Sequence, residues 1–470
     1  MSTRRRDPGN TREAILNRRP VMGQLRDRYK NGRGKMPILK NSNEWKWVSI
    51  KAVKPYARHA RRHHKRTIEK VKKVIAHYGQ IVPIIVDPNN VIIDGHAVWQ
   101  SMTELGSGEI AVVVVAGRSD PEIKALRLAL NRIPSDTAWD NERVRQELQE
   151  LVSLSFDLEL TGFDTPEIDH ILDVDLQKLN VVDADIPAID KAAVSAIGDV
   201  WLCGDHRVGC GDARDQAFVD RVRNGKVSDI CFVDPLCNVL SAGFVSDEGR
   251  ARRREFAHAS GEMSRDEFTA YLGASLEVLR AASTPQAYIF ACVDWRHIFE
   301  LIGAGRQCGL DLVNLGLWTK TNAGICSLYR SQFELICVFK AAAEADTNNI
   351  ERGRHGRNCS NFWSHRGHNA FSSDLPVKPV LMIADALRDV TRRGGIVLDT
   401  FLGFGSTLMA AEQTGRHCFG IEKDPLYVDL AIRRWQTKTA RDAIHAETGE
   451  LFEARARHLT ATAEESRHGS

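Results

Sequence analysis

Short apolar runs alternate with helix-spaced apolar positions along most of the chain, which is the pattern of an α/β protein. The clearest case lies between residues 396 and 422. There, a buried-strand pattern over Ile396–Leu398 precedes a glycine-bearing loop, good helix formers over Ser406–Thr414 and a second strand pattern over His417–Ile421. This order predicts one βαβ unit, with Asp399 closing its first strand.

The loop of this unit has the composition of a ligand cradle. Gly403 and Gly405 allow the backbone to approach a ligand that a Cβ atom would exclude. Glu422 ends the second strand about 20 residues further on, which is where an acidic residue binds a ribose diol. A glycine loop between strand and helix also occurs as a plain turn, so this pattern alone leaves both interpretations open.

A second apolar run also ends in an acidic residue. Ser228–Val233 is predicted to be a strand, and Asp234 and Pro235 follow it directly. Upstream, Gly204-Asp205 is typical of a hairpin turn between two short strands. Ligands of doubly wound sheets collect beyond the carboxyl ends of the strands. We therefore expect Asp234 and Asp399 to lie at one site.

Composition narrows the class of protein without identifying it. The 470 residues are 43% hydrophobic and 27% charged, which suits a globular protein of two or three domains. The net charge of +3 excludes a uniformly basic nucleic-acid coat, but local basic clusters allow contacts with a phosphate backbone. No apolar run approaches the ~18 residues of a membrane span, and no signal-peptide pattern is present, so we expect a cytoplasmic location.

The cysteines do not form a metal-binding pattern. None of the ten falls in a CxxC pair, and they alternate with apolar residues on predicted strands. Cys203 and Cys210 flank His206, but the spacing fits no zinc site. We interpret the cysteines as buried free thiols and expect no metal.

Several motifs in a fixed order give residues 198–440 a resemblance to DNA methyltransferases that act on exocyclic base amines. They are GDVWLCGDHRVGCGD, the strand ending in Asp234-Pro235, SLYRSQFELICVFK, VKPVLMIADALRD, VLDTFLGFGSTLMAAEQTGR and GIEKDPLYVDLAIRRWQ. The Asp-Pro loop precedes the glycine loop, which is the β-type order of that family. The resemblance implies a Rossmann-like S-adenosylmethionine-dependent methyltransferase domain over residues 196–440.

The resemblance also implies roles for individual residues. The Asp234 carboxylate and the Pro235 carbonyl would accept the hydrogens of a flipped base amine, which leaves the nitrogen lone pair facing the methyl group. An Asp at the start of this loop favours adenine N6 as the acceptor. The residues implied in cofactor binding are Asp212, Lys378, Asp399, Phe401, Gly403, Gly405 and Glu422.

The Asp-Pro loop departs from the usual Asp-Pro-Pro-Tyr, because Leu236-Cys237 follows Pro235. A cysteine cannot stack on a flipped base, and such stacking is worth about 1–3 kcal/mol. Phe362 or Trp363 is a candidate for a substitute ring. Two hypotheses follow: a site-specific DNA methyltransferase of weakened activity, and a catalytically defective DNA-binding protein that retains the fold.

Residues 46–135 resemble the ParB/sulfiredoxin-like domain, a smaller α+β domain. The resemblance rests on a helix pattern over Thr67–Tyr78, two short strands joined at residues 88–90, and the stretch IIDGHAVWQSMTELG. In that family the helix after the Gly-His turn faces a nucleotide phosphate or DNA. The arginine that usually follows is absent here. His96 is therefore interpreted either as a DNA contact or as a structural residue.

The remaining segments are predicted from composition. Residues 1–45 are expected to be a basic disordered tail, 136–195 a helical connector and linker, and 441–470 a polar C-terminal tail. Double-stranded DNA is the predicted partner, and the pattern indicates no oligomeric state. Arg250, Arg252 and Arg253 are interpreted as a phosphate-contacting arm or as a solvated charged face.

Overall fold

The computed structural model describes most of the chain. The described residues are 45–58, 63–154, 156–173, 192–235, 263–320, 331–340, 349, 360–364 and 377–468. They fall into two compact units, residues 1–138 and 139–470, which are described separately. Almost all of the predicted basic tail, the Leu236-Cys237 pair and the arginines Arg250, Arg252 and Arg253 lie outside the described residues.

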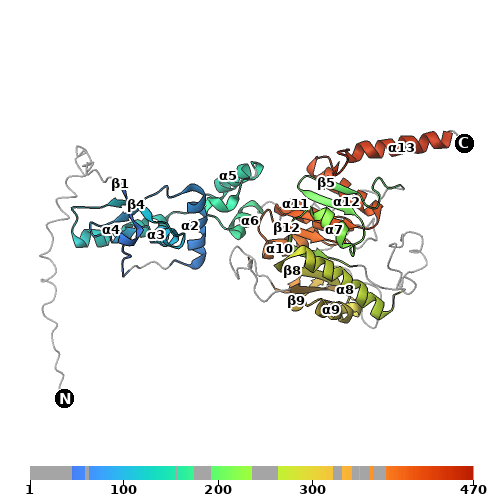
Figure 1. Cartoon of the computed structure of the whole chain (residues 1–470), viewed down its shortest axis with the longest axis horizontal. Helices are drawn as coiled ribbons and strands as arrows, with labels where there is room; N and C mark the ends of the chain where they lie inside the picture. Colours follow the sequence, from blue (N-terminus) through green and yellow to red (C-terminus); the bar gives the residue numbers. More distant parts are fainter. Residues whose placement is uncertain are drawn as a thin grey trace, which may run out of the picture. The chain divides into compact units, whose positions relative to one another are not determined.

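The N-terminal unit is a four-stranded mixed sheet with helices (Figure 1). Its strand order is β1-β4-β2-β3, with β2 parallel to β4 and the other neighbours antiparallel. The elements are β1 (Trp45–Ser49), α2 (Lys65–Tyr78), β2 (Ile84–Val86), β3 (Ile92–Asp94), α3 (His96–Glu104), β4 (Glu109–Val114) and α4 (Asp120–Arg132). The predicted α+β class and the predicted helix and strand pair are confirmed.

The second unit begins with a small helical segment. It contains α5 (Asn141–Ser153), a 3-10 turn η3 (Leu158–Thr161) and α6 (Thr165–Asp173). These elements share a core of their own, made of Leu148, Leu158, Ile168 and Ile171. The Asp140 side chain caps α5 by accepting the backbone amides of residues 142 and 143.

A ten-stranded sheet forms the rest of this unit, in the order β11-β9-β10-β8-β7-β12-β13-β6-β5-β14. Strands β8, β7, β12, β13 and β6 are parallel, as expected for strands linked by helical crossovers. The strands are β5 (Val200–Cys203), β6 (His206–Cys210), β7 (Ser228–Val233), β8 (Ser283–Val293), β9 (Asp311–Thr319), β10 (Phe333–Lys340), β11 (Phe362–Trp363), β12 (Ile396–Asp399), β13 (His417–Glu422) and β14 (Ile444–His445).

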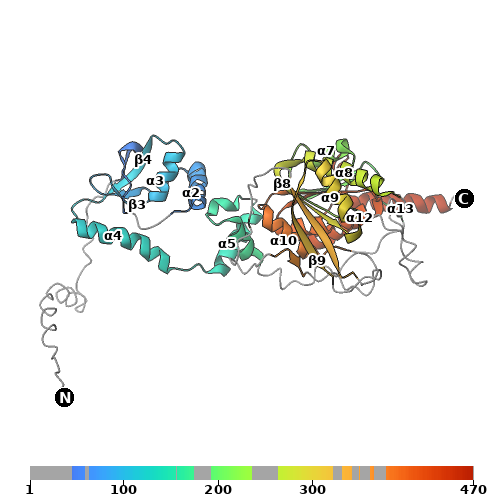
Figure 2. The same cartoon turned by 90° about the horizontal axis from the view of Figure 1, so that it is seen from below.

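Helices cover both faces of this sheet (Figure 2). On one face α7 (Gln216–Arg223), α8 (Arg265–Ala282) and α9 (Ile298–Gln307) share a core with the strands. On the other face α10 (Val380–Val390), α11 (Ser406–Thr414) and α12 (Pro425–Thr439) share a second core. The predicted α/β class is confirmed, and β7 and α11 have the predicted bounds. None of the helices in the described part of the chain combines the length and apolar composition needed to cross a membrane.

The crossovers place a ligand site at one edge of the sheet. After β7 the chain goes on to β8, which lies next to β7 on one side of it in the sheet. After β12, the other neighbour of β7, the chain goes on to β13, which lies further towards the opposite side of the sheet. Because connections leave these two strands in opposite directions, a crevice opens beyond their carboxyl ends. Asp234 follows β7 and Asp399 ends β12, so both predicted carboxylates lie at this edge.

The chain after residue 440 differs from the predicted polar tail. Strand β14 pairs with β5, and α13 (Phe452–His468) follows. Phe452 is fully buried and contacts Trp201 edge to face, with ring centroids 5.1 Å apart. His445 bonds to Asp199 at 3.2 Å. A few well-placed apolar residues thus anchor this segment, although its composition is polar.

Six of the seven cysteines that the structure describes are buried free thiols, as predicted, whereas Cys308 is only partly buried. Cys203 and Cys210 are fully buried, and burial raises the pKa of the Cys210 thiol to about 12. His206 lies between them in sequence but bonds elsewhere: Nε2 to the Glu412 carboxylate at 2.8 Å, and Nδ1 to the Cys418 amide at 2.9 Å. This histidine is therefore part of the hydrogen-bonded core.

Candidate active site

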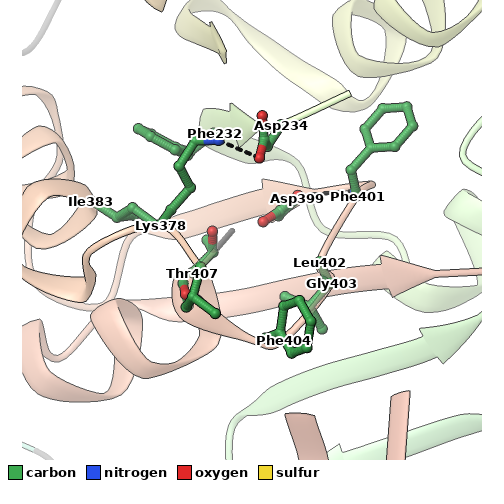
Figure 3. A pocket seen from close by; sticks show the side chains of 12 residues that line it. Phe232, Asp234, Lys378, Ile383, Asp399, Phe401, Leu402, Gly403, Phe404 and Thr407 are labelled. Atoms are coloured by element: carbon green, nitrogen blue, oxygen red, sulfur yellow. Dashed lines mark hydrogen bonds and ion pairs between the residues drawn. The ribbon is translucent and has the colours of Figure 1, made fainter. Parts of the chain in front are cut away.

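A pocket opens at the carboxyl ends of β7 and β12 (Figure 3). Asp234 and Asp399 enter it from the two neighbouring strands, and Lys378 enters it from the segment before α10. The lining residues are Phe232, Asp234, Val377, Lys378, Ile383, Asp399, Phe401, Leu402, Gly403, Phe404, Ser406 and Thr407. The structure therefore brings together five predicted site residues from three separate stretches of sequence.

Asp399 is a buried carboxylate, with only 4% of its surface exposed. Its Oδ1 accepts the Phe401 amide at 2.9 Å, and Thr407 donates a further hydrogen bond to the carboxylate. Burial raises the Asp399 pKa to about 7, and these two hydrogen bonds only partly oppose that shift. Among the described residues no cation pairs with it. The pocket thus contains a buried anion that a cationic ligand would neutralise.

Asp234 belongs to a line of alternating charges. Its Oδ2 accepts a hydrogen bond from Lys378 Nζ at 2.5 Å, and the same ammonium is 3.0 Å from Glu334 Oε2. Glu334 Oε1 in turn accepts a bond from Lys320 at 3.0 Å. These four groups sum to zero charge when all are ionised, so each buried charge has a partner of opposite sign.

The pKa values of this line follow from burial and neighbouring charges. Burial opposes the ammonium form of Lys378, but the carboxylates of Asp234 and Glu334 outweigh it and hold its pKa well above the usual value. Burial also acts on Glu334, yet the two lysines lower its pKa to about 2. For Asp234, burial dominates and raises the pKa despite Lys378. Glu334 and Lys378 are therefore ionised at neutral pH.

Glu422 organises the glycine loop from the end of β13. Its Oε2 accepts the Gly403 amide at 2.9 Å, and its Oε1 accepts the amides of Lys423 and Asp424 at 2.8 and 2.9 Å. Burial raises the Glu422 pKa, and the hydrogen bonds from the three amides only partly oppose that rise. The predicted neighbourhood of Glu422 and the glycine loop is therefore present in the structure.

The two loop glycines have different surroundings. Gly403 has φ +52° and lines the pocket, and a Cβ atom there would meet only the Phe401 carbonyl at 3.9 Å. Gly405 has φ +77° and is absent from the pocket lining; a Cβ atom there would lie 2.9 Å from Ala431 Cβ. Gly405 thus allows α11 and α12 to approach each other, whereas Gly403 leaves space for a ligand.

The other predicted residues lie outside the pocket lining. Asp212 pairs with Arg214 at 2.9 Å and with Lys423 at 3.0 Å, beside the end of β13. Pro235 is buried directly after Asp234. In the N-terminal unit, His96 is 8% exposed, and its Nε2 accepts the Tyr56 amide at 3.3 Å. This burial favours the structural interpretation of His96.

Neither candidate for the substitute ring lines the pocket. Phe362 is 58% exposed on the edge strand β11, and Trp363 contacts Phe290 with ring centroids 6.3 Å apart. The pocket rings come instead from Phe232, Phe401 and Phe404. Phe404 is held against Tyr427 at 4.9 Å.

Sequence reasoning missed Glu334 and Thr407. Glu334 is the second residue of the largely apolar strand β10. An acidic residue beside a buried lysine becomes recognisable only once β10 and the segment before α10 are placed side by side. Thr407 is the second residue of α11, and its position there was a usable signal, because side chains at a helix start lie near the loop before it.

Comparison with known proteins agrees with this site. Residues 229–433 match the N6_N4_Mtase model, described as DNA methylase, and residues 142–197 match the ParB-methyltransferase HTH domain. The chain therefore carries a DNA methylase domain of the N6/N4 class, preceded by a ParB-methyltransferase helix-turn-helix domain. The latter occupies most of residues 136–195, which were predicted to be a helical connector and linker.

Curated relatives match part of the chain. The type II methyltransferase M.BglI of Bacillus subtilis is 29% identical over 147 residues, which is 28% of this chain and 41% of the relative. The type II methyltransferase M.Cfr9I of Citrobacter freundii is 29% identical over 153 residues, which is 31% of this chain and 49% of the relative. The chain thus spans less than half the length of either relative.

Solved structures resemble the chain at lower identity. The M1.HpyAVI–SAM complex is 16% identical, with a TM-score of 0.36, and covers 48% of this chain and 97% of that one. The cytosine-N4-specific PvuII DNA methyltransferase is 13% identical, with a TM-score of 0.37, over 53% and 90%. The ParB protein of Caulobacter crescentus with CTP-gamma-S is 13% identical, with a TM-score of 0.26, over 29% and 83%.

Proposed function

We propose that this protein transfers a methyl group from S-adenosylmethionine to an exocyclic amine of DNA, with adenine N6 as the acceptor. The observation that carries the proposal is the shared pocket of Asp234 and Asp399 at the ends of β7 and β12, inside the segment that matches the DNA methylase model. One carboxylate serves the base and the other serves the cofactor.

The cofactor side of the pocket suits a cationic nucleoside. S-adenosylmethionine supplies an activated methyl group on a positively charged sulfur. Asp399 offers a buried carboxylate that has no counter-charge among the described residues, and burial raises its pKa to about 7. Gly403 leaves space beside it, and Glu422 holds that glycine in place. We assign cofactor binding to Asp399, Phe401, Gly403 and Glu422.

The base side depends on Asp234. Lys378 holds one carboxylate oxygen, Oδ2, and we assign the other oxygen, Oδ1, to the hydrogens of the base amine. The Pro235 carbonyl is the second acceptor in this proposal. Both acceptors stabilise an amine nitrogen whose lone pair has left the ring, which is the form that attacks a methyl group. A flipped base is required, since these atoms lie inside a pocket.

Transfer of labelled methyl groups from S-adenosylmethionine to unmethylated double-stranded DNA tests this function. We expect incorporation with the intact chain and a loss of at least about 100-fold with Asp234→Asn, since one transition-state acceptor is worth about that factor. Asp311→Asn, a matched change at an exposed residue at the start of β9, is expected to leave the rate unchanged. Equal rates for all three proteins would contradict the assignment of Asp234.

A second candidate function is a DNA-binding protein without turnover. It is favoured by Leu236-Cys237 and by the position of Phe362 and Trp363 away from the pocket. Calorimetric titration with S-adenosylmethionine and with DNA separates binding from turnover. The double change Leu236→Pro/Cys237→Tyr is expected to raise methyl transfer about tenfold or more, because a stacking ring is restored. An active intact chain that this change does not improve would remove the case for a weakened site.

The N-terminal unit is proposed to be a ParB-like domain that assists DNA docking. Its sheet, its Gly95-His96 turn and the helix that follows have the arrangement that the sequence resemblance implies. Gly95 has φ +98°, and a Cβ atom there would lie 2.5 Å from Ile84. This turn therefore depends on glycine.

A DNA-binding assay on a chain from which residues 139–470 are removed would measure the DNA affinity of the N-terminal unit alone.

A further inference from the structure

A buried ion cluster joins the helix-turn-helix segment to the methylase fold. Asp169 of α6 is 4% exposed, and its two oxygens accept bonds from Arg416 Nη1 and Nη2 at 3.1 and 2.9 Å. Arg393 Nη1 donates a third bond to Asp169 at 3.0 Å. One carboxylate therefore holds two guanidinium groups that come from different parts of the methylase sequence.

The cluster is fully hydrogen-bonded at its centre. Besides Asp169, Arg416 bonds through Nε to Thr391 Oγ1, through Nη1 to the Thr414 carbonyl and through Nη2 to the Thr391 carbonyl, at 3.2, 2.7 and 3.0 Å. All five N–H donors of this guanidinium thus have acceptors. Gly415 contributes space, because a Cβ atom there would lie 2.5 Å from the Arg393 guanidinium.

The two arginines lie at the amino ends of central strands. Arg393 follows α10 and precedes β12, and Arg416 follows α11 and precedes β13. These parallel strands end at Asp399 and Glu422 on the opposite edge of the sheet. Each residue of a strand advances about 3.3 Å, so the four residues of β12 lie between the end of the strand next to the cluster and the end next to the pocket.

The charge of the segment is unfavourable for DNA contact. Residues 142–197 contain thirteen acidic and four basic residues. Of the two arginines on α5, Arg145 is tied to the Ile171 carbonyl and to Glu142, and Arg143 is paired with Asp140. Proteins that bind a phosphate backbone present basic faces, whereas this segment has a net negative charge.

We infer that residues 142–173 are a docking element of the methylase fold and not its DNA reader. Through Asp169 they clamp the two segments from which β12 and β13 start. They hold the amino ends of β12 and β13 in place. The carboxyl ends of the same two strands carry Asp399 and Glu422. The clamp itself does not depend on the proposed methyl transfer, since its groups and contacts lie outside the pocket.

Hydrogen exchange of the full chain tests the clamp. Asp169→Asn keeps the shape of the side chain but leaves the buried Arg416 and the partly buried Arg393 without a counter-ion. We expect amide exchange to rise at least about 100-fold in α6 and, together with it, in residues 391–395 and 414–417. Glu147→Gln, a matched change at an exposed acid of α5, is expected to change none of these. A rise confined to α6, or no rise at all, would overturn the clamp.

DNA binding by the intact chain, by Arg143→Ala and by Glu147→Gln tests whether residues 142–173 read DNA. Affinity of the full chain for a random double-stranded fragment is measured at one salt concentration. We expect Arg143→Ala to change the affinity less than twofold and Glu147→Gln to leave or strengthen it. A loss of tenfold or more with Arg143→Ala would show that this segment reads DNA and would overturn the inference. If the intact chain does not bind the fragment, the proposed function fails, and the exchange experiment still decides the clamp.

Discussion

Replacing Asp399 by Asn is expected to stabilise the folded protein at pH 8 and to weaken its binding of the cofactor. The Asp399 carboxylate is 4% exposed, and burial raises its pKa from 3.8 to about 7. In the unfolded chain the Asp399 carboxyl group has the ordinary Asp pKa of 3.8. Between these two values the folded protein binds a proton that the unfolded protein does not, so stability falls as the pH rises through this window. Asn removes that cost and still accepts the Phe401 amide.

The magnitude follows from the pKa difference. One pKa unit corresponds to about 1.4 kcal/mol, so the ionised carboxylate costs up to about 4 kcal/mol at pH 8. At pH 4.5 the cost is only about 1 kcal/mol. The stability of Asp399→Asn relative to the intact protein is therefore expected to improve by about 3 kcal/mol between pH 4.5 and pH 8.

Urea unfolding of the full chain at the two pH values measures this change. Taking the difference between variant and intact protein at each pH cancels every group except the one replaced. Asp311→Asn, at an exposed residue, is expected to show no such pH dependence. In calorimetric titration, Asp399→Asn is expected to bind S-adenosylmethionine at least about tenfold more weakly than the intact protein, because the cofactor loses a charged partner. A variant that gains no stability towards pH 8 would refute the claim that Asp399 is a buried uncompensated anion.

Three further substitutions test neighbouring parts of the site. Gly405→Ala is expected to destabilise the protein by about 1–3 kcal/mol in urea unfolding, because it adds a strained φ and a contact with Ala431. Gly403→Ala is expected to destabilise the protein by about 1 kcal/mol, because of the positive φ alone. It should nevertheless weaken cofactor affinity more than Gly405→Ala does. A larger loss of cofactor affinity with Gly405→Ala would contradict the roles given to the two glycines. Glu334→Gln is expected to cost about 3 kcal/mol at pH 7 by leaving Lys378 undercompensated. Because the Glu334 pKa is lowered to about 2, this loss should shrink as the pH falls from 4.5 towards 2, and a pH-independent loss would contradict it.

The sequence was sufficient to predict the ends of the central strands. Asp234 and Asp399 each follow an apolar run and begin an abrupt loop, and that local pattern survives folding because buried parallel strands are short and uniformly apolar. Good helix formers over Ser406–Thr414 likewise predicted α11 with its observed bounds. Local patterns decide these features, so local reasoning finds them.

Long-range pairing explains what the sequence could not predict. The Asp169 cluster joins residues more than 200 positions apart, and nothing near Asp169 distinguishes it from the other acids of α6. Gly405 has the same local setting as Gly403, and only the arrival of α12 separates their roles. The C-terminal segment was expected to be a tail because one buried Phe452 carries little weight in a polar composition.

The most direct test of the proposed function is the modified-base content of DNA from a methylation-free host that expresses this chain. Nucleosides from that DNA are separated and identified by mass spectrometry, with the Asp234→Asn chain expressed as the control. The proposed function predicts N6-methyladenine with the intact chain and none with the control. N4-methylcytosine would contradict adenine as the acceptor, and the absence of any methylated base would contradict methyl transfer itself.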